Sequence, residues 1–99
     1  MLKHLQTNTT VSVVDGKMQS VEGMSSLPAF KVPSSAEVIA IREVPAALAF
    51  SFRFKDVYDI THFHYLMEGT TRYRVVGVET FNTPFGAHTR VHAEMKAGT

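Results

Sequence analysis

The segment RYRVVGVETF, residues 72–81, carries the clearest indication of the fold. It is rich in β-branched and aromatic residues, as are strands that pack one face against a core. Because successive side chains of a strand point to opposite faces, Tyr73 and Val75 should face the core. The flanking arginines, Arg72 and Arg74, should then face outward. Gly77 interrupts the apolar run, and a glycine inside a strand often marks a bulge or a bend at a barrel corner. We therefore expect a strand that packs on a core and bends at Gly77.

Three more segments in the second half of the chain alternate between apolar and polar residues. They are ALAFSFRF at 47–54, ITHFHYLM at 60–67 and AHTRVHAEM at 87–95. Such alternation predicts strands with one buried face. In the last segment the inward residues should be Val91, Ala93 and Met95, and the outward residues His88, Arg90, His92 and Glu94. Turn signals at Gly69 and in NTPFG then join the strands into an antiparallel meander.

The turn at Gly69 fixes the register of the strands on either side of it. A three-residue loop centred on Gly69 would place Tyr65 opposite Tyr73. It would also place Phe63 opposite Val75, so that aromatic and β-branched side chains share one face. A two-residue loop of residues 68 and 69 would instead set the same aromatic side chains against arginines. Because a one-residue slip moves every side chain to the other face, we predict the three-residue loop.

The first half of the chain is less regular. TTVSVV at 9–14, followed by Asp-Gly, predicts a strand and a turn. AEVIAIREV at 36–44 is either a strand or a helical turn, and its β-branched content favours the strand. Residues 16–36 combine Gly, Pro and Ser with scattered apolar residues and show no regular period, so we expect a long irregular loop there. Its apolar side chains would either contact a partner protein or fold back over the open end of the sheet.

The length and composition indicate one small domain. The 99 residues are 44% hydrophobic and 19% charged, which is typical of a globular chain. We expect a single all-β domain over residues 1–99, a small antiparallel barrel or sandwich of about five or six strands. The net charge of +1 argues against nucleic-acid binding by bulk electrostatics. Without cysteine the sequence has no disulfide and no thiolate zinc site. No apolar run reaches the length of a membrane span or forms a signal-peptide core, so we expect a soluble, cytosolic chain.

Histidines are the sharpest candidates for a chemical site. His62 and His64 alternate on one predicted strand, so that both could ligate one metal ion. A carboxylate and a third histidine, Glu68 and His88, would complete a set like that of a cupin. We give more weight to exposed or half-exposed histidines on a polar strand face, because the predicted register puts two arginines beside His62 and His64. The glycines that bracket cupin motifs are also not at matching positions. We expect no metal and no cofactor.

Other chemistry is sparse in this sequence. There is no cysteine nucleophile, and the serines of the irregular loop have no histidine nearby in the sequence to activate them. We expect no enzymatic activity, no catalytic residue and no small-molecule substrate. A remaining alternative is a barrel that binds single-stranded nucleic acid through a basic, aromatic face. The residues of that face would be Arg53, Arg72, Arg74, Tyr58 and Tyr73.

The second half of the chain also follows a recognisable order of features. An aromatic strand ends near an arginine in FRF at 52–54, and a polar stretch with Asp56 and Asp59 follows it. A tight turn at Gly69, a strand from Tyr73 to Val78 and the alternating segment RVHAEMKAG at 90–98 complete the order. In these features the chain resembles the head–tail joining (head-completion or stopper) proteins of tailed bacteriophages. The likeness covers about the last half of the chain, and residues 15–36 match nothing in the family's pattern.

This resemblance implies a structural role in the virion. Proteins of that family form a ring between the portal end of the capsid and the tail, where they close the DNA channel or connect the tail. It implies a homo-oligomeric ring whose partners are the portal or its adaptor and tail-terminator or other tail proteins. Packaged DNA in the channel is a further candidate partner. The chain would reside in the neck of the virion, and in the host cytoplasm during assembly.

The irregular loop is the part that we expect to make these contacts. Ring neighbours can complete loops or open strand edges of a small β domain. The predicted anchors are the apolar residues of the loop, Met18, Met24, Leu27, Phe30 and Val32. Gly69, Tyr73 and Gly77 then have a structural role in the sheet. Deleting residues 18–32 should accordingly leave a folded monomer that does not join particles.

Overall fold

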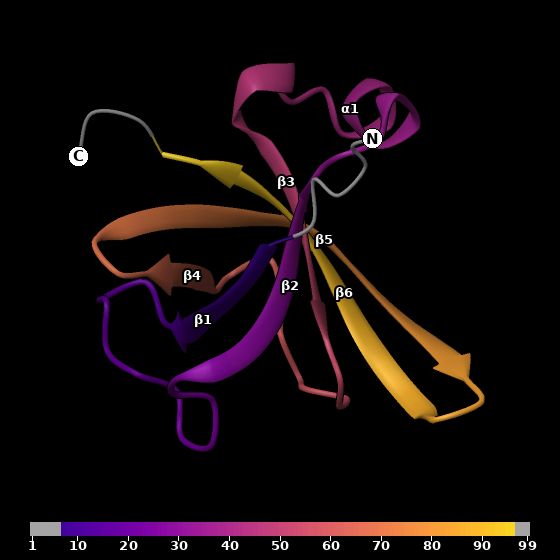
Figure 1. Cartoon of the computed structure of the whole chain (residues 1–99). Helices are drawn as coiled ribbons and strands as arrows, with labels where there is room; N and C mark the ends of the chain where they lie inside the picture. The colour runs from indigo at the N-terminus through magenta and orange to yellow at the C-terminus, as the bar shows by residue number, and fades with distance from the viewer. Residues whose placement is uncertain (1–6, 97–99) are drawn as a thin grey trace.

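The computed structural model describes residues 7–96, whose six strands form a closed antiparallel barrel (Figure 1). The elements in chain order are β1 (Thr7–Val14), β2 (Leu27–Pro33), α1 (Ala36–Arg42), the short 3-10 helix η1 (Ala46–Leu48), β3 (Ala49–Phe54), β4 (Tyr65–Glu68), β5 (Thr71–Thr83) and β6 (Gly86–Met95). Around the barrel the strands follow the order β1-β2-β3-β6-β5-β4, and the pairing of β4 with β1 closes it. The predicted all-β barrel is therefore confirmed.

The core lies inside the barrel and is built from the inward side chains of the strands. Phe52 and Phe54 on β3 are fully buried, as are Tyr73 on β5 and Val91 on β6. The rings of Phe52 and Tyr73 meet edge to face with their centroids 4.9 Å apart, a favoured aromatic geometry. The inward orientation predicted for Tyr73, Val75, Val91 and Ala93 is confirmed by their burial.

Gly77 lies at an irregularity of the barrel, as its position in the sequence predicted. The pairing of β5 with β6 shifts between Val75 and Gly77, which marks a β-bulge. A bulge increases the local twist and bends the strand, so it helps a small sheet to close. The outer side of Gly77 is covered by Arg42 of α1, whose Cζ would lie 2.7 Å from a Cβ at this position. The glycine therefore also lets the helix side chain approach the sheet closely.

The register predicted for the hairpin at Gly69 is wrong by one residue. Leu66 pairs with Tyr73, and Tyr65 pairs with Arg74, so the turn consists of residues 69 and 70. Gly69 has the predicted turn position, with a φ of 62° that favours glycine. Leu66 is fully buried, whereas Phe63, predicted as a strand residue opposite Val75, is 74% exposed. The predicted strand over 60–67 is shorter than expected, because β4 begins only at Tyr65.

The predicted loop over 16–36 is also wrong in extent, because residues 27–33 form β2 between β1 and β3. The remaining irregular segment folds back on the barrel, which is the second of the two alternatives. The amide of Val13 donates to the carbonyl of Met24 at 2.9 Å, and that of Val21 donates to the carbonyl of Val13 at 3.0 Å. Val21 and Met24 pack against the core. The turn after β1 is held by Asp15, whose Oδ1 accepts the amides of residues 17 and 19.

The segment predicted as a strand at 36–44 is instead the helix α1. Ser35 is its N-cap, and its Oγ accepts the backbone N–H of Val38 at 3.2 Å. Glu37 lies in the first turn and Arg42 in the last, where each complements the helix dipole. Glu43 ends the helix in the left-handed conformation, with φ 56°. These terminal signals outweighed the β-branched content that favoured a strand.

Candidate functional site

The register of neighbouring strands arranges outward side chains in rows across one face of the barrel. In the first row, Phe30 on β2 lies opposite Arg53 on β3, and Arg53 lies opposite Arg90 on β6. The next row along the strands contains Ser51 on β3 opposite His92 on β6. Both rows continue onto β5. The second row lies beside α1, whereas the side chains of the first row remain partly exposed.

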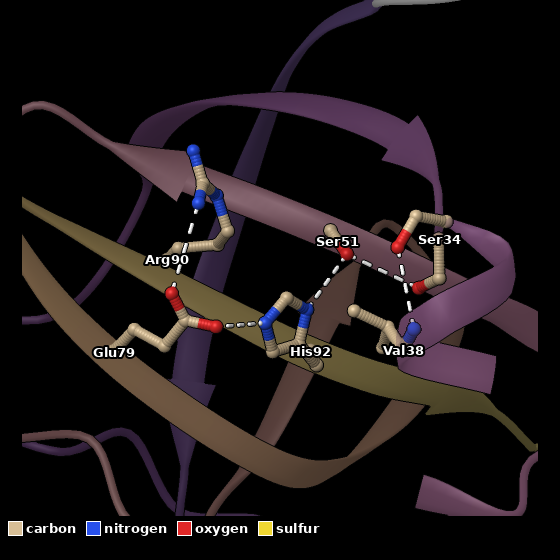
Figure 2. Close-up of polar contacts among 7 residues, drawn as sticks. Ser34, Val38, Ser51, Glu79, Arg90 and His92 are labelled. Carbon is tan, nitrogen blue, oxygen red and sulfur yellow. Dashed lines mark hydrogen bonds and ion pairs between the residues drawn. The ribbon is translucent and has the colours of Figure 1, made fainter. Parts of the chain in front are cut away.

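A chain of polar contacts runs through the second row (Figure 2). The hydroxyls of Ser34 and Ser51 are 3.1 Å apart, and Ser51 Oγ is 2.8 Å from His92 Nδ1. His92 Nε2 is 2.8 Å from a carboxylate oxygen of Glu79, whose other oxygen is 3.7 Å from Arg90. The hydrogen bond from His92 is the first cause that holds the pKa of Glu79 below its usual value. With Nε2 donating to Glu79, Nδ1 accepts the Ser51 hydroxyl proton.

The order hydroxyl, imidazole, carboxylate is that of a serine hydrolase triad, but its surroundings differ from such a site. Ser51 lies in the middle of β3 with β2 paired on one side and β6 on the other. The backbone N–H groups around it are therefore committed to the ladders, whereas acyl transfer needs free donors that stabilise an oxyanion. Ser51 and His92 are only 7% and 3% exposed. We interpret the contacts as a structural link between the sheet and the segment that begins α1.

The outward histidines of β6 are less accessible than predicted. His88 and His92 do point away from the core, but both are buried on the outside of the barrel rather than exposed. His92 lies in the polar chain beside α1. His88 Nδ1 is 3.4 Å from a guanidinium nitrogen of Arg53, and its ring meets that of Phe81 with centroids 5.6 Å apart. The prediction of exposed or half-exposed strand histidines is therefore wrong for this pair.

The four residues of the cupin-like alternative do not come together. His62 lies in a turn against the ring of Phe63, with centroids 4.1 Å apart. His64 accepts the backbone N–H of residue 61 at 3.1 Å. Glu68 is at the far end of β4, and His88 is on the outside of β6. Within residues 7–96, no group of three or more His, Asp or Glu side chains is placed to hold a metal ion.

Glu68 instead forms the centre of a polar cluster that joins four strands. Lys31 Nζ donates to Oε1 at 2.8 Å, and the Tyr73 hydroxyl donates to the same oxygen at 2.7 Å, while Thr9 donates to Oε2. Burial alone would raise the pKa of Glu68, but these hydrogen bonds outweigh it and hold that pKa below its usual value. Burial would likewise lower the pKa of Lys31, but its bonds to Glu68 and Tyr73 raise it. Lys31 and Glu68 therefore form an ion pair with a structural role, which Thr9 and Tyr73 support by hydrogen bonds.

The basic, aromatic face predicted from the sequence does not form as a unit. Tyr73 is in the core, and Tyr58 packs its ring against Phe54 with centroids 5.9 Å apart. Arg74 pairs with Glu94 at 2.7 Å, and Arg72 lies over the ring of Tyr65. Arg53 belongs to a different basic surface, formed with Lys55 and Arg90. Sequence reasoning missed that surface because its members come from strands whose pairing it could not establish.

The predicted assembly anchors are divided between the interior and the surface. Leu27 is in the core and Met24 packs against the core. Phe30 and Val32 are partly buried outward residues of β2, and Met18 is 38% exposed. More strongly exposed apolar side chains lie elsewhere, namely Ile41, Val57, Phe63 and Phe85. A large apolar residue inside a turn sequence such as NTPFG is the signal that could have identified Phe85.

Comparison with known proteins gave no relative of this chain. It matches no protein-family model, no curated protein and no solved structure. Across residues 7–96, no helix is both long and apolar enough to cross a membrane. The interpretation of its function therefore starts from the surfaces of the barrel itself.

Proposed function

We propose that this chain is a structural protein of a tailed-phage virion. In this proposal it forms a homo-oligomeric ring in the neck, joins the portal or its adaptor to the tail, and closes the DNA channel. One structural observation supports the proposal. Of the five large apolar side chains that are exposed within residues 7–96, four lie on loops at one end of the barrel: Met18, Val57, Phe63 and Phe85.

The antiparallel topology places these loops at the same end of the barrel. Strands β1, β3 and β5 end, and strands β2, β4 and β6 begin, at the same end of the barrel. The connections at that end are residues 15–26, 55–64 and 84–85, which lie toward the lower part of Figure 1. Helix α1 and the turn after β4 connect strands at the opposite end. Among residues 7–96, the loops at this end therefore carry four of the five exposed large apolar side chains, and exposed apolar surface is a feature of sites that bind another protein.

The closed barrel also limits how neighbours can attach. Each of the six described strands has a hydrogen-bonded neighbour on both sides over part of its length. The four-residue β4 leaves the stretch of β5 beyond Arg74 and the start of β1 without a strand on that side, but most of the described sheet offers a partner no free edge. Contacts with neighbouring subunits are then expected from loops. A ring needs two different complementary surfaces on each subunit, because its contacts are head to tail. In this proposal the apolar loop end is one of these surfaces. The resemblance of residues 52–98 to head–tail joining proteins is the reason for proposing a tailed-phage virion as the particle.

A double substitution at the loop end tests the proposal. Val57→Ser with Phe63→Ser changes side chains that are 54% and 74% exposed, so the monomer should keep its fold. We expect the wild-type chain to be found at the neck of complete particles, and the double variant to leave tail-less heads. The matched control is Ile41→Ser, which removes an equally exposed apolar side chain from α1 at the other end.

Negative-stain imaging of particles and quantification of the chain in them provide the measurement. Circular dichroism and thermal melts of the purified variants check that the fold is retained. Normal head–tail joining by a folded double variant would contradict the role of the loop end. Absence of the wild-type chain from purified particles would contradict the proposed function as a whole.

A further inference from the structure

The uncovered part of the outer sheet face is unusually basic for a chain whose net charge is only +1. Arg53 on β3 and Arg90 on β6 are direct cross-strand partners. Lys55 directly follows the last residue of β3. Like charges directly opposite each other destabilise a sheet. The two arginines at the centre of this face are therefore placed against the preference of the sheet itself.

Carboxylates on the described chain neutralise this surface only in part. Within residues 7–96, neither Arg53 nor Lys55 forms an ion pair with an acidic side chain. Arg90 is 3.7 Å from Glu79, whose other oxygen is taken by His92. The next acidic residue along the chain, Asp56, is exposed in the loop after Lys55. An anion placed between Arg53 and Arg90 would relieve their repulsion.

Aromatic rings alternate with these cations. The guanidinium of Arg53 lies 4.6 Å and the ammonium of Lys55 5.4 Å from the ring centre of Phe30. Arg90 lies 4.4 Å from the ring centre of Phe81. At the tip of the β5–β6 hairpin, Phe85 is 92% exposed. An open hollow is lined by Phe30, Arg53, Lys55, Phe85 and His88, so cations and rings from three segments of the chain border one space.

We propose that this face binds single-stranded nucleic acid. Its three cations contact successive phosphates, and the rings of Phe30 and Phe85 stack on bases, as in other small barrels that bind single strands. Stacking requires bases whose faces are free, which a duplex does not offer. An acidic peptide would satisfy the cations, but it would leave the exposed ring of Phe85 without a planar partner. The proposal does not depend on a role in the virion.

Fluorescence anisotropy of a labelled oligothymidylate of about 15 nucleotides tests the proposal with the purified full-length chain, since single-strand sites on small barrels span about 4–16 nucleotides. Three phosphate contacts predict a slope of about −2 for the logarithm of the binding constant against that of the salt concentration. Arg53→Gln should make this slope shallower by about 0.7 and weaken binding at low salt. Phe30→Leu should weaken binding about tenfold while keeping the slope, because it removes stacking and no charge.

The matched control is Arg74→Gln, which removes an outward arginine from β5 that pairs with Glu94 instead of facing the hollow. Its binding should equal that of the wild type. Circular dichroism shows whether each variant is folded. If Arg53→Gln is not, Lys55→Gln provides a second variant, because it removes a cation from an exposed position and should make the slope shallower by the same amount. An abasic strand of the same length should bind about fiftyfold more weakly than oligothymidylate, because it loses the stacks on both Phe30 and Phe85.

Three results would overturn the proposal. One is no binding of oligothymidylate at about 50 mM salt, where contacts to phosphates are strong. The second is equal binding of the abasic strand, which would indicate a surface for polyanions in general, including acidic proteins. The third is an equal loss of binding in Arg74→Gln and Arg53→Gln, which would place the contact elsewhere on the barrel.

Discussion

Glu68 accepts hydrogen bonds from three strands other than its own. Thr9 lies on β1, Lys31 on β2 and Tyr73 on β5, so one carboxylate joins four of the six strands. The side chains of Lys31 and Glu68 are only 22% and 19% exposed. The ammonium group of Lys31 also lies 5.2 Å from the ring centre of Phe50. Removing one member of such a pair leaves the other charge poorly solvated, which costs more than the loss of an exposed pair.

The stability of the chain should therefore depend on the ionisation of Glu68. Because its folded pKa is depressed below the usual 4.5, its contribution is fully present above that pH and is lost as the pH falls through the folded pKa. We expect Glu68→Gln to lower the free energy of unfolding by about 1–2 kcal/mol at neutral pH. The difference from the wild type should shrink as the pH falls below 4.5 and through the folded pKa of Glu68. Urea denaturation at several pH values measures it.

The control for this prediction is Glu94→Gln, which breaks the pair with Arg74, whose side chain is 46% exposed. It should change stability less, because solvent screens an exposed pair. A loss in Glu68→Gln that is the same at low and neutral pH would contradict the role of the charge. The pH dependence of the Lys31 contribution has the opposite direction. Its folded pKa is raised, so its contribution to stability is fully present below pH 10.5 and is lost as the pH rises through the folded pKa.

Individual residues of β5 were predictable from the sequence, whereas the partners of Glu68 were not. Tyr73 and Val75 face the core and Gly77 lies at a bulge, because alternation and glycine act within a few residues of the chain. The cluster around Glu68 depends on Lys31, which is 37 residues away. That contact exists only because β2 and β4 both pair with β1. Local patterns do not contain this information.

At the scale of elements, β2 is the strand that the sequence concealed. Its segment, LPAFKVP, has one proline at its second position and another at its last position. Proline normally argues against a strand. Pairing with β3 runs only from Phe30 to Pro33, so Pro28 lies outside that ladder. Leu27 and Ala29 point into the core with the expected alternation. For α1 the capping serine was visible in the sequence, but a seven-residue helix without a buried residue in the described structure gives little apolar periodicity.

Deleting residues 18–32 tests the assignment of β2. The sequence alone predicts a folded monomer, but the structure predicts that the deletion removes most of β2 and its two core residues. Both β1 and β3 would lose a hydrogen-bonded neighbour, so the barrel would open. We expect loss of the cooperative thermal transition and of dispersed amide signals in NMR spectra. Met18→Ser, which changes only an exposed turn residue, should melt as the wild type does. A cooperatively folded deletion variant would contradict the position of β2.

At the scale of the whole molecule, the closed barrel separates two surfaces with different chemistry. The loop end presents Val57 and Phe63, which carry no charge, and no cation lies over the ring of Phe63 among the described contacts. The outer face beyond α1 presents Arg53 and Arg90 with aromatic rings beneath them. The all-β class followed from the alternating segments, whereas the predicted number of strands included 36–44, which forms α1, and did not include β2. The gathering of loops at one end followed only once β2 and the closing pair of β4 and β1 were known.

Phe85 belongs to both surfaces, because it lies on a loop at the apolar end and also borders the basic hollow. If both proposals hold, Phe85→Ser should reduce head–tail joining and also weaken oligothymidylate binding about fivefold, since it removes a stacking ring. Phe63→Ser should reduce joining alone, and Arg53→Gln should reduce binding alone. Particle imaging and anisotropy on the same three variants measure both properties. Loss of binding in Phe63→Ser, or loss of joining in Arg53→Gln, would show that the two surfaces do not act independently. An unchanged Phe85→Ser in both assays would exclude this hairpin tip from either contact.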